Sequence, residues 1–490
     1  MKYESTRGSL GYKNAPQAII RGIAEDKGLY VPQQIPHLTE SLEELGKLSY
    51  QEIAYKVIGA FFDDFTAEEL QACIDGAYDE KFEAEEIVPI VEAGGAHFLE
   101  LYHGKTAAFK DMALSILPYL MTTSLKKEGV TDKICILTAT SGDTGKAALE
   151  GFAGVEGTEI VVFYPYGAVS QVQERQMTSQ EGENTHVFAI KGNFDNAQTG
   201  VKKIFSDDDF AAKLAERGIR LSSANSINIG RLAPQVMYYF KAYRDLLDAG
   251  KIKMGDTVNY SVPTGNFGNI LAGYLAKLLG LPVGMLICAS NANNVLTDFI
   301  RTGTYDKRRP LLKTTSPSMD ILVSSNLERL LYLMSGCDAE LVAQLMTQLN
   351  RDGVYTVPEA MKEAISKEFY ADFCNDAHAA ETIAKVWQKH HYLCDPHTAA
   401  SWAVAESYVQ ETGDSRPMVV LSTASPYKFP AAVLEAIGGD LTGDEFDQME
   451  RLEAVTGVAI PKNLSTLRGK LERHTGVINK DEMLDFVLGL

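Results

Sequence analysis

The sequence predicts an α/β protein built on parallel β-sheet, with helical additions at both ends. From about residue 97, short apolar runs alternate with amphipathic stretches, and strands separated by helices of this size form βαβ units. The predicted strands are apolar along their length, as expected where both faces of a sheet are covered. The chain has 490 residues, more than one hydrophobic core usually serves, so we expect two or three domains.

The N-terminal segment differs in texture from the α/β body. Its first ninety or so residues look mostly helical and carry acidic patches such as Asp63-Asp64 and Glu68-Glu69. They end in an extended run at 86–91. Beyond this segment, a helix is predicted over 112–120. We therefore expect an N-terminal domain over residues 1–95.

The α/β body is predicted from regularly alternating elements. The predicted strands are 134–137, 159–164, 186–190, 258–262 and 283–289. The predicted helices are 146–152, 170–180, 196–205, 231–247 and 269–279. Together they indicate parallel sheet flanked by helices.

The second half of the chain is more polar. Residues 291–390 look mainly helical with no repeated strand signal, which indicates an insertion on the α/β body. Strand character returns at 418–423, and the last sixty residues look helical and polar. We expect a catalytic body over 96–430, with that insertion around 291–390, and a C-terminal helical extension over 431–490.

Charge and composition exclude some classes of partner. The net charge of −19 disfavours nucleic acid and anionic membranes, because both would be repelled. The N-terminus has no apolar signal region, and no stretch approaches the roughly 18 apolar residues of a membrane span. Six scattered cysteines without a C-x-x-C pair indicate reduced thiols. We expect a soluble, cytoplasmic protein.

Two turns follow predicted strands at the sheet edge where ligands bind in open α/β folds. The first, Thr138–Gly145, contains Ser141, Gly142, Asp143 and Thr144 just before a helix. Hydroxyls, backbone N–H groups and the helix N-terminus would favour an anion such as a carboxylate. A helix start capped by Ser141 or Asp143 is the alternative.

The second turn is Pro263–Asn269, which contains Gly265, Asn266, Phe267, Gly268 and Asn269. Two glycines and two asparagines allow the positive-φ backbone that turns successive N–H groups onto one phosphate. A left-handed turn or a β-bulge without a ligand explains the same residues.

A lysine, Lys110, opens the apolar helix that begins near Met112. A lysine at a helix start is usually a solvated surface residue, and it lies unfavourably at the positive end of the helix dipole. Where burial and neighbours lower its pKa, a lysine becomes a Schiff-base nucleophile. The residue type alone leaves both readings open.

The order of these motifs resembles the threonine synthase family, within the tryptophan-synthase-β type of pyridoxal-phosphate fold. The resembling segments are Met1–Gly8, Ala24–Pro32, His103–Asp111, Ala139–Gly145, Asn225–Leu232, Pro263–Gly273, Asp395–Ala399 and Thr423–Pro430. The resemblance extends over residues 1–430 and implies the longer branch of the family, which has an N-terminal domain. It also implies two open parallel-sheet domains.

The resemblance implies roles for individual residues. Lys110 matches the lysine that carries pyridoxal 5′-phosphate and shuttles protons. The turn Gly265, Asn266, Phe267, Gly268 and Asn269 matches the cradle of the cofactor phosphate. Thr423 matches the hydroxyl residue beside the pyridine nitrogen. Ser141, Gly142 and Thr144 match the loop that holds the substrate carboxylate, and Asp143 matches the cofactor O3′ side.

Three further residues match a segment that the family places near the substrate phosphate, namely Asn225, Ser226 and Arg231. A guanidinium fork suits phosphate, although Arg231 could also be a helix-surface arginine. Three positions depart from the family pattern: Lys105 stands for a common Pro, Asp143 for Asn, and Ser425 for His. The roles of these three side chains stay open.

The activity implied is that of a threonine synthase, a pyridoxal-phosphate-dependent carbon–oxygen lyase of threonine biosynthesis. Its substrates would be O-phospho-L-homoserine and water, and its products L-threonine and phosphate, by γ-elimination and β-addition of water. The alternatives are a hydroxy-amino-acid dehydratase or a β-replacement synthase on the same fold, and a non-catalytic homologue. We expect no metal, and the chain is expected to be a monomer or a homodimer.

Overall fold

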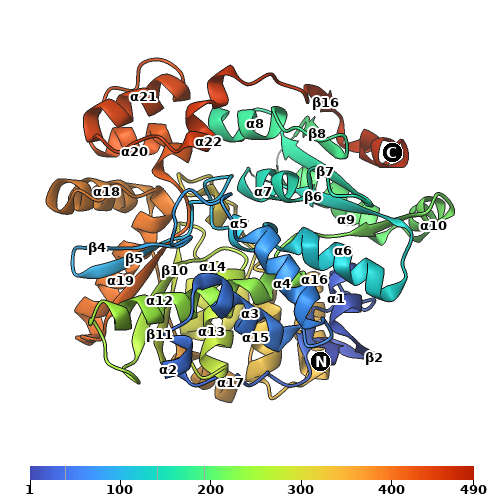
Figure 1. Ribbon diagram of the computed structural model, residues 1–490, viewed down its shortest axis with the longest axis horizontal. Coiled ribbons are helices and arrows are strands. Elements are labelled where there is room, and N and C mark those ends of the chain that lie inside the picture. Colours follow the sequence, from blue (N-terminus) through green and yellow to red (C-terminus); the bar gives the residue numbers. More distant parts are fainter. Residues whose placement is uncertain (39, 141, 193) are drawn as a thin grey trace.

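The computed structural model describes residues 1–38, 40–140, 142–192 and 194–490, and it contains two separate open sheets. The larger sheet has the order β14 (Phe369–Phe373), β11 (Val283–Ser290), β10 (Val258–Pro263), β15 (Met418–Ser422), β5 (Ala96–Glu100) and β4 (Ile90–Ala93). Its neighbours are parallel except for the edge strand β4, which pairs antiparallel with β5. Figure 1 shows this sheet on the left of the molecule.

The second sheet is parallel throughout. Its order is β16 (Gly476–Ile478), β8 (Thr185–Ile190), β7 (Thr158–Pro165), β6 (Lys133–Ala139) and β9 (Ile219–Ser222). Central strands such as β10 are buried along their whole length, which is why their sequences do not alternate. The prediction of an α/β protein with two open parallel-sheet domains is confirmed.

Most helices of the α/β body lie where the sequence predicts them. They are α7 (Asp143–Phe152), α8 (Gln171–Thr178), α9 (Phe194–Ser206) and α13 (Gly268–Leu278), with α10 (Asp208–Glu216) in addition. The predicted helix 231–247 is divided into α11 (Ile229–Leu232), a 3₁₀ turn over Ala233–Gln235, and α12 (Met237–Asp248). Pro234 has no N–H to continue the helical hydrogen bonds, which explains the interruption. The predicted helix 112–120 is likewise divided, into α5 (Asp111–Leu114) and α6 (Leu117–Glu128).

The N-terminal segment is less helical than expected. Strands β1 (Tyr3–Ser5), β2 (Gly8–Lys13) and β3 (Tyr30–Pro32) form an antiparallel sheet. Helix α1 (Ala15–Arg21) lies between β2 and β3 in the sequence, and helices α2 (Leu42–Leu45), α3 (Tyr50–Phe61) and α4 (Ala67–Ala77) follow β3. β1 lies between β2 and β3, and Tyr3 is buried. β1 and β3 have three residues each and are too short for periodicity to identify them.

Residues 291–390 contain helices α14 (Val295–Thr302), α15 (Leu327–Met334), α16 (Ala339–Asp352), α17 (Glu359–Glu368) and α18 (Asp376–His390). They also contain strands, which the sequence did not indicate. β12 (Thr304–Asp306) and β13 (Val354–Thr356) form a small antiparallel pair, and β14 joins the larger sheet beside β11. The long helix α19 (Pro396–Thr412) then packs against β10, β11 and β15.

The C-terminal residues run across the top of the molecule in Figure 1, from the side of the larger sheet to the smaller one. They form α20 (Pro430–Ala436), α21 (Glu445–Thr456), α22 (Lys462–Ser465), β16 and α23 (Met483–Leu488). β16 adds a parallel edge strand next to β8, which was also not expected from the sequence. Within the described part of the chain, no helix combines the length and apolar character needed to cross a membrane.

Candidate active site

The predicted site residues follow the carboxyl ends of strands from both sheets. Lys110 comes ten residues after β5, and Thr423 directly follows β15. The turn 264–267 follows β10, and Gly142 follows β6 in the smaller sheet. The carboxyl ends of parallel strands lie at one edge of a sheet, where ligands bind in open α/β folds. Contacts of Asp143 with Ser318 and Lys428 join the two groups of strand ends. Figure 1 shows α5, whose N-cap is Lys110, between the two sheets.

Lys110 lies at the N-cap of α5 and makes few compensating contacts. Its Nζ donates to Ser318 Oγ at 3.3 Å and lies 5.2 Å from the centre of the Phe109 ring. Burial lowers the pKa of Lys110 to about 8, and Asp143 counteracts this only in part. A lysine with such a pKa has a substantial neutral fraction near physiological pH, so it can act as a nucleophile and as a base.

The backbone next to Lys110 is fixed against the strand end that carries Thr423. Phe109 N–H donates to the Thr423 carbonyl at 2.8 Å, and Ser425 N–H donates to the Ala107 carbonyl at 3.0 Å. Ala107 has φ 57°, a left-handed backbone conformation three residues before Lys110. These backbone contacts place Thr423 next to Phe109, the residue before Lys110.

Asp143 is buried and surrounded by donors. Its Oδ1 accepts from Gln173 Nε2 at 2.8 Å and lies 2.6 Å from Lys428 Nζ, while its Oδ2 accepts from Ser318 Oγ at 3.3 Å. Burial alone would raise the pKa of Asp143, but the Lys428 ammonium, and then Lys110, hold it well below its ordinary value. Asp143 is therefore an ionised carboxylate.

The turn before α7 is shaped by Thr140 and Gly142. Thr140 Oγ1 accepts from the N–H groups of Gly142 at 3.0 Å and Gly145 at 2.9 Å. Gly142 has φ 135°, and a Cβ there would lie 2.5 Å from the Gln173 side chain. Thr144 is half-buried in the first turn of α7, and Ser141 lies outside the described residues. Thr140 already accepts the Gly145 N–H, but the N–H groups of Asp143 and Thr144, at the first two positions of α7, have no intrahelical partner and can bind an anion.

The turn after β10 leads into α13. Phe267 has φ 63°, and α13 begins at Gly268 without a side-chain cap in the described structure. A Cβ at Gly265 would lie 2.5 Å from the Ser318 carbonyl oxygen, so only glycine permits this approach. Asn266 is exposed, and its carbonyl accepts from Asn326 N–H at 3.0 Å.

A buried donor without a partner lies in the first turn of α13. The Asn269 Oδ1 accepts from Tyr238 OH at 2.6 Å and from Tyr239 OH at 3.0 Å. This fixes the amide orientation, and the buried Asn269 Nδ2 then has no partner among the described residues. The uncapped helix start, the glycines and this spare donor fit a phosphate group. Together with Lys110, they fit pyridoxal phosphate.

Arg231 is a buried arginine without a carboxylate partner in the described part of the chain. Its Nη1 donates to the Ala224 carbonyl at 2.7 Å, and its Nε has no partner among the described residues. Burial lowers the pKa of Arg231 to about 10, and its charge in turn lowers the pKa of Lys110. Asn225 and Ser226 are half-buried just before α11. The surface-arginine alternative for Arg231 is wrong.

Several contacting residues were not singled out from the sequence. Ser318 contacts both Lys110 and Asp143, yet it lies in the segment 291–390, where no motif indicated a function. Lys428 and His397 belong to quoted motifs but had no role assigned to them. Lys428 is completely buried, and its Nζ also donates to the Thr106 carbonyl at 2.9 Å. The one sequence signal that could have indicated Lys428 as a buried partner of Asp143 is a lysine in a run of apolar residues.

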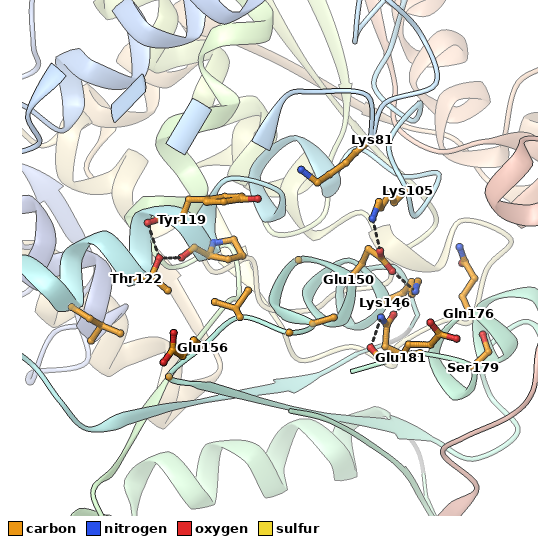
Figure 2. A pocket seen from close by; sticks show the side chains of 18 of the residues that line it. Lys81, Lys105, Tyr119, Thr122, Lys146, Glu150, Glu156, Gln176, Ser179 and Glu181 are labelled. Carbon is orange, nitrogen blue, oxygen red and sulfur yellow. Dashed lines mark hydrogen bonds and ion pairs between the residues drawn. The ribbon is translucent and has the colours of Figure 1, made fainter. Parts of the chain in front are cut away.

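The two remaining departures, Lys105 and Ser425, make no side-chain contact with Lys110 or Asp143 among the described residues. Lys105 is exposed, and its Nζ lies 3.2 Å from Glu150, which also pairs with Lys146 (Figure 2). These residues line an open groove of about 1090 Å³, whose described lining includes none of the predicted site residues. Ser425 is buried, and its hydroxyl accepts from Tyr427 N–H as a helix cap. Neither residue contacts Lys110 in the described structure.

Family comparisons cover nearly the whole chain. Residues 2–78 match the threonine synthase N terminus, residues 93–424 the pyridoxal-phosphate dependent enzymes, and residues 398–484 the threonine synthase C-terminal family. The chain is 39% identical to threonine synthase from Pseudomonas aeruginosa over 97% of its own length and 98% of the relative's.

Human threonine synthase-like 1 is 40% identical over 89% of this chain. The chain spans only 59% of that relative's length. Among solved structures, pyridoxal-phosphate-bound threonine synthase from Brucella melitensis superimposes with a TM-score of 0.87 at 39% identity, covering 100% of this chain and 98% of the other. The predicted family, enzyme class and cofactor are thereby confirmed, and the chain belongs to the threonine synthase family of pyridoxal-phosphate-dependent enzymes.

Proposed function

We propose that this chain is a threonine synthase that converts O-phospho-L-homoserine and water into L-threonine and phosphate. Family membership alone does not select the reaction, because relatives named threonine synthase and threonine synthase-like 1 are equally similar to this chain. The observation that carries the proposal is Arg231, a buried guanidinium without a carboxylate partner in the described chain. A buried charge of this kind is costly unless an anionic ligand pairs with it.

We assign two anion sites to two different turns. The turn Gly265, Asn266, Phe267, Gly268 and Asn269 would hold the cofactor phosphate at the start of α13. Asn225, Ser226 and Arg231 would hold the substrate phosphate, since a guanidinium can bind phosphate with two parallel hydrogen bonds. A dehydratase or a β-replacement synthase needs no second phosphate site, so Arg231 argues against both. A non-catalytic homologue would not need Lys110 with a lowered pKa.

The other residues bind and orient the substrate. Ser141, Gly142 and Thr144 would bind its carboxylate at the start of α7, where N–H groups and the helix dipole favour an anion. Thr423 would lie beside the pyridine nitrogen, and Asp143 on the side of O3′. When bound, pyridoxal phosphate supplies the electron sink that stabilises negative charge next to the amino-acid α-carbon.

Lys110 is the residue that would move protons. With a pKa of about 8, its amine can accept the Cα proton and later return protons to Cα and Cγ. In the balanced reaction the Cγ–O bond to phosphate breaks, Cβ loses a proton and gains the oxygen of water, and Cγ gains a proton. Arg231 would hold the phosphate as it leaves. The six cysteines are free, and we propose the cytoplasm as the location of this activity.

The test follows hydrogen through the reaction. With O-phosphohomoserine in heavy water, the product should be threonine with deuterium in its methyl group and at Cα, and with one original hydrogen on Cβ. Proton NMR of the product measures this directly. A keto acid as the main product, or a methyl group free of deuterium, would contradict the proposal.

A variant tests the second phosphate site in the same assay. Arg231→Leu should lower kcat/KM for O-phosphohomoserine about ten- to a hundred-fold, the value of one charge-assisted hydrogen bond to a buried phosphate. Cofactor binding should persist, since Arg231 is not part of the cradle. The matched control is Arg220→Leu, because Arg220 is an exposed arginine paired with Asp132 and should behave like wild type. An unchanged kcat/KM in Arg231→Leu would remove the substrate phosphate from this site.

A further inference from the structure

Ser318 is the residue whose hydroxyl contacts Lys110. It lies in the 3₁₀ turn Pro317–Met319, between α14 and α15. Its Oγ accepts a hydrogen bond from Lys110 Nζ at 3.3 Å and donates one to Asp143 Oδ2 at 3.3 Å. Ser318 therefore bridges the lysine and the carboxylate.

The direction of these two hydrogen bonds is fixed by charge. A serine hydroxyl has a single hydrogen, and an ionised carboxylate can only accept. Asp143 is held as a carboxylate by Lys428 at 2.6 Å and by Gln173 at 2.8 Å. The Ser318 hydrogen is therefore committed to Asp143, and toward Lys110 the Ser318 oxygen presents only a lone pair.

The position of Ser318 is fixed independently of Lys110. Its backbone N–H donates to His397 Nε2 at 3.1 Å, and His397 Nδ1 lies 2.5 Å from Asp395 Oδ2. Both His397 and Asp395 are buried. On its other side, the Ser318 carbonyl oxygen lies so close to Gly265 that a Cβ there would be at 2.5 Å. These contacts hold the turn in place, so the position of the Ser318 hydroxyl does not depend on Lys110.

We propose that Ser318 is a further catalytic residue, which accepts a hydrogen bond from the Lys110 amine, orients it and favours its protonated form. An acceptor stabilises an ammonium more than an amine, so Ser318 helps Lys110 to hold the proton that it removes from Cα. Asp143, Lys428, His397 and Asp395 act through Ser318 as positioning residues. The inference rests on the proposed function only in its assignment of Lys110 as the cofactor lysine.

Charged side chains also shift the pKa of Lys110, and a test of Ser318 must leave those side chains unchanged. The charged groups that face Lys110 are Asp143, Arg231, Lys428 and Asp111. Ser318→Ala changes none of these charged groups; it removes the acceptor for Lys110 Nζ together with the hydrogen bond that Ser318 donates to Asp143 Oδ2. Loss of this acceptor should lower the pKa of Lys110, which burial has already lowered to about 8.

The experiment measures how fast the cofactor-free full-length chain captures pyridoxal phosphate at different pH values. Capture requires the neutral Lys110 amine, so the pH midpoint of the rate, followed by visible absorption, reports its pKa. In Ser318→Ala the midpoint should move about one unit lower, the shift expected for one lost hydrogen bond to a charged group. Ser318→Cys, nearly the same size and a weaker acceptor, should move it in the same direction. Ser318→Thr keeps the hydroxyl and should retain the wild-type midpoint.

The matched control is Ser316→Ala. Ser316 is a buried serine two residues earlier, whose hydroxyl contacts Asn291 and Thr314 rather than Lys110. Its variant should keep the wild-type midpoint. A wild-type midpoint in both Ser318→Ala and Ser318→Cys, or an equal shift in Ser316→Ala, would overturn the role of Ser318. If Lys110→Ala captures the cofactor as wild type does, the assignment of Lys110 fails instead, which separates the two proposals.

Discussion

At the scale of single residues, the site depends on charges that are buried in pairs. Lys428 and Asp143 are 0% and 4% exposed, and they neutralise each other beside Lys110. A buried charge without its partner costs several kcal/mol, whereas a neutral pair of similar shape costs little. The pairing with Lys428 therefore allows a buried carboxylate at position 143. The asparagine of the family pattern is uncharged and would need no such partner.

The prediction is that removing one partner destabilises the protein and removing both restores it. Lys428→Met should lower the free energy of unfolding at pH 7 by about 3–5 kcal/mol, because it leaves Asp143 buried and unpaired. Lys428→Met combined with Asp143→Asn should recover most of the loss. Urea unfolding of the cofactor-free proteins measures both values.

The free energy of unfolding should change with pH in opposite directions in the two single variants, Lys428→Met and Asp143→Asn. In the wild type the pKa of Asp143 is lowered on folding, so its stabilisation is present above about pH 4 and is lost as the pH falls. In Lys428→Met, burial should raise the pKa of Asp143, so stability should fall as the pH rises through that value. In Asp143→Asn, the unpaired Lys428 should instead make stability rise with pH. The same slope in both single variants would show that the two groups are not coupled.

At the scale of elements, two turns approach so closely that they act as one unit. The turn between β10 and α13 contacts the turn Pro317–Met319 through Gly265, and Ser324 Oγ donates to the Gly265 carbonyl at 2.7 Å. The proposed phosphate cradle and the residue that contacts Lys110 are thus positioned by the same contact. Gly265 does not have a positive φ. Glycine is therefore required at this position for the close approach of the two turns and not for its backbone conformation.

Gly265→Ala should therefore weaken cofactor binding by displacing both turns. A Cβ at 2.5 Å from a backbone oxygen cannot be relieved by rotating a side chain, and overpacking of this kind costs about 1–3 kcal/mol. Reconstitution titrated with pyridoxal phosphate should show an affinity lower by about tenfold or more. Gly469→Ala is the matched control, because a Cβ there would meet no atom within 4 Å. Equal affinities in the two variants would rule out the contact as a determinant of the cradle.

At the scale of the whole molecule, Arg329 connects the N-terminal segment to the candidate site. This arginine, 1% exposed, donates to the Tyr30 carbonyl at 3.0 Å and the Ile227 carbonyl at 2.6 Å, and it also donates to Asn326. Asn326 in turn donates to the carbonyls of Asn266 and Ser226. One buried network thus joins strand β3, the cofactor cradle and the proposed substrate-phosphate segment.

Arg329→Met should destabilise the protein and weaken cofactor binding together. Leaving two buried carbonyls without donors should cost on the order of 3 kcal/mol. Equilibrium unfolding and pyridoxal-phosphate titration measure the two effects. Arg308→Met is the control, because Arg308 is an exposed arginine and should stay within about 0.5 kcal/mol of wild type. Normal cofactor affinity in a destabilised Arg329→Met would show that the N-terminal domain supports the fold but not the cradle.

The sequence by itself determined the parallel α/β body, the family, the cofactor and the turns that follow its strands. These features depend on local patterns: apolar runs, glycines at sharp turns, and short motifs in a fixed order. The sequence could not identify β14 and β16, because an edge strand is defined by its neighbour and three to five residues carry little periodicity.

Only the tertiary structure decided which side chains surround Lys110. Ser318 is 208 positions away in the sequence and lies in a segment without a recognisable motif. The protonation state of Asp143 depends on Lys428, which follows β15, the last strand of the larger sheet in sequence order. Arg231 is distinguished from a surface arginine by its burial and by the absence of a carboxylate partner in the described chain. Charge, burial and hydrogen-bond direction arise from contacts between distant segments, and so the chemistry of the site depends on how both sheets pack around it.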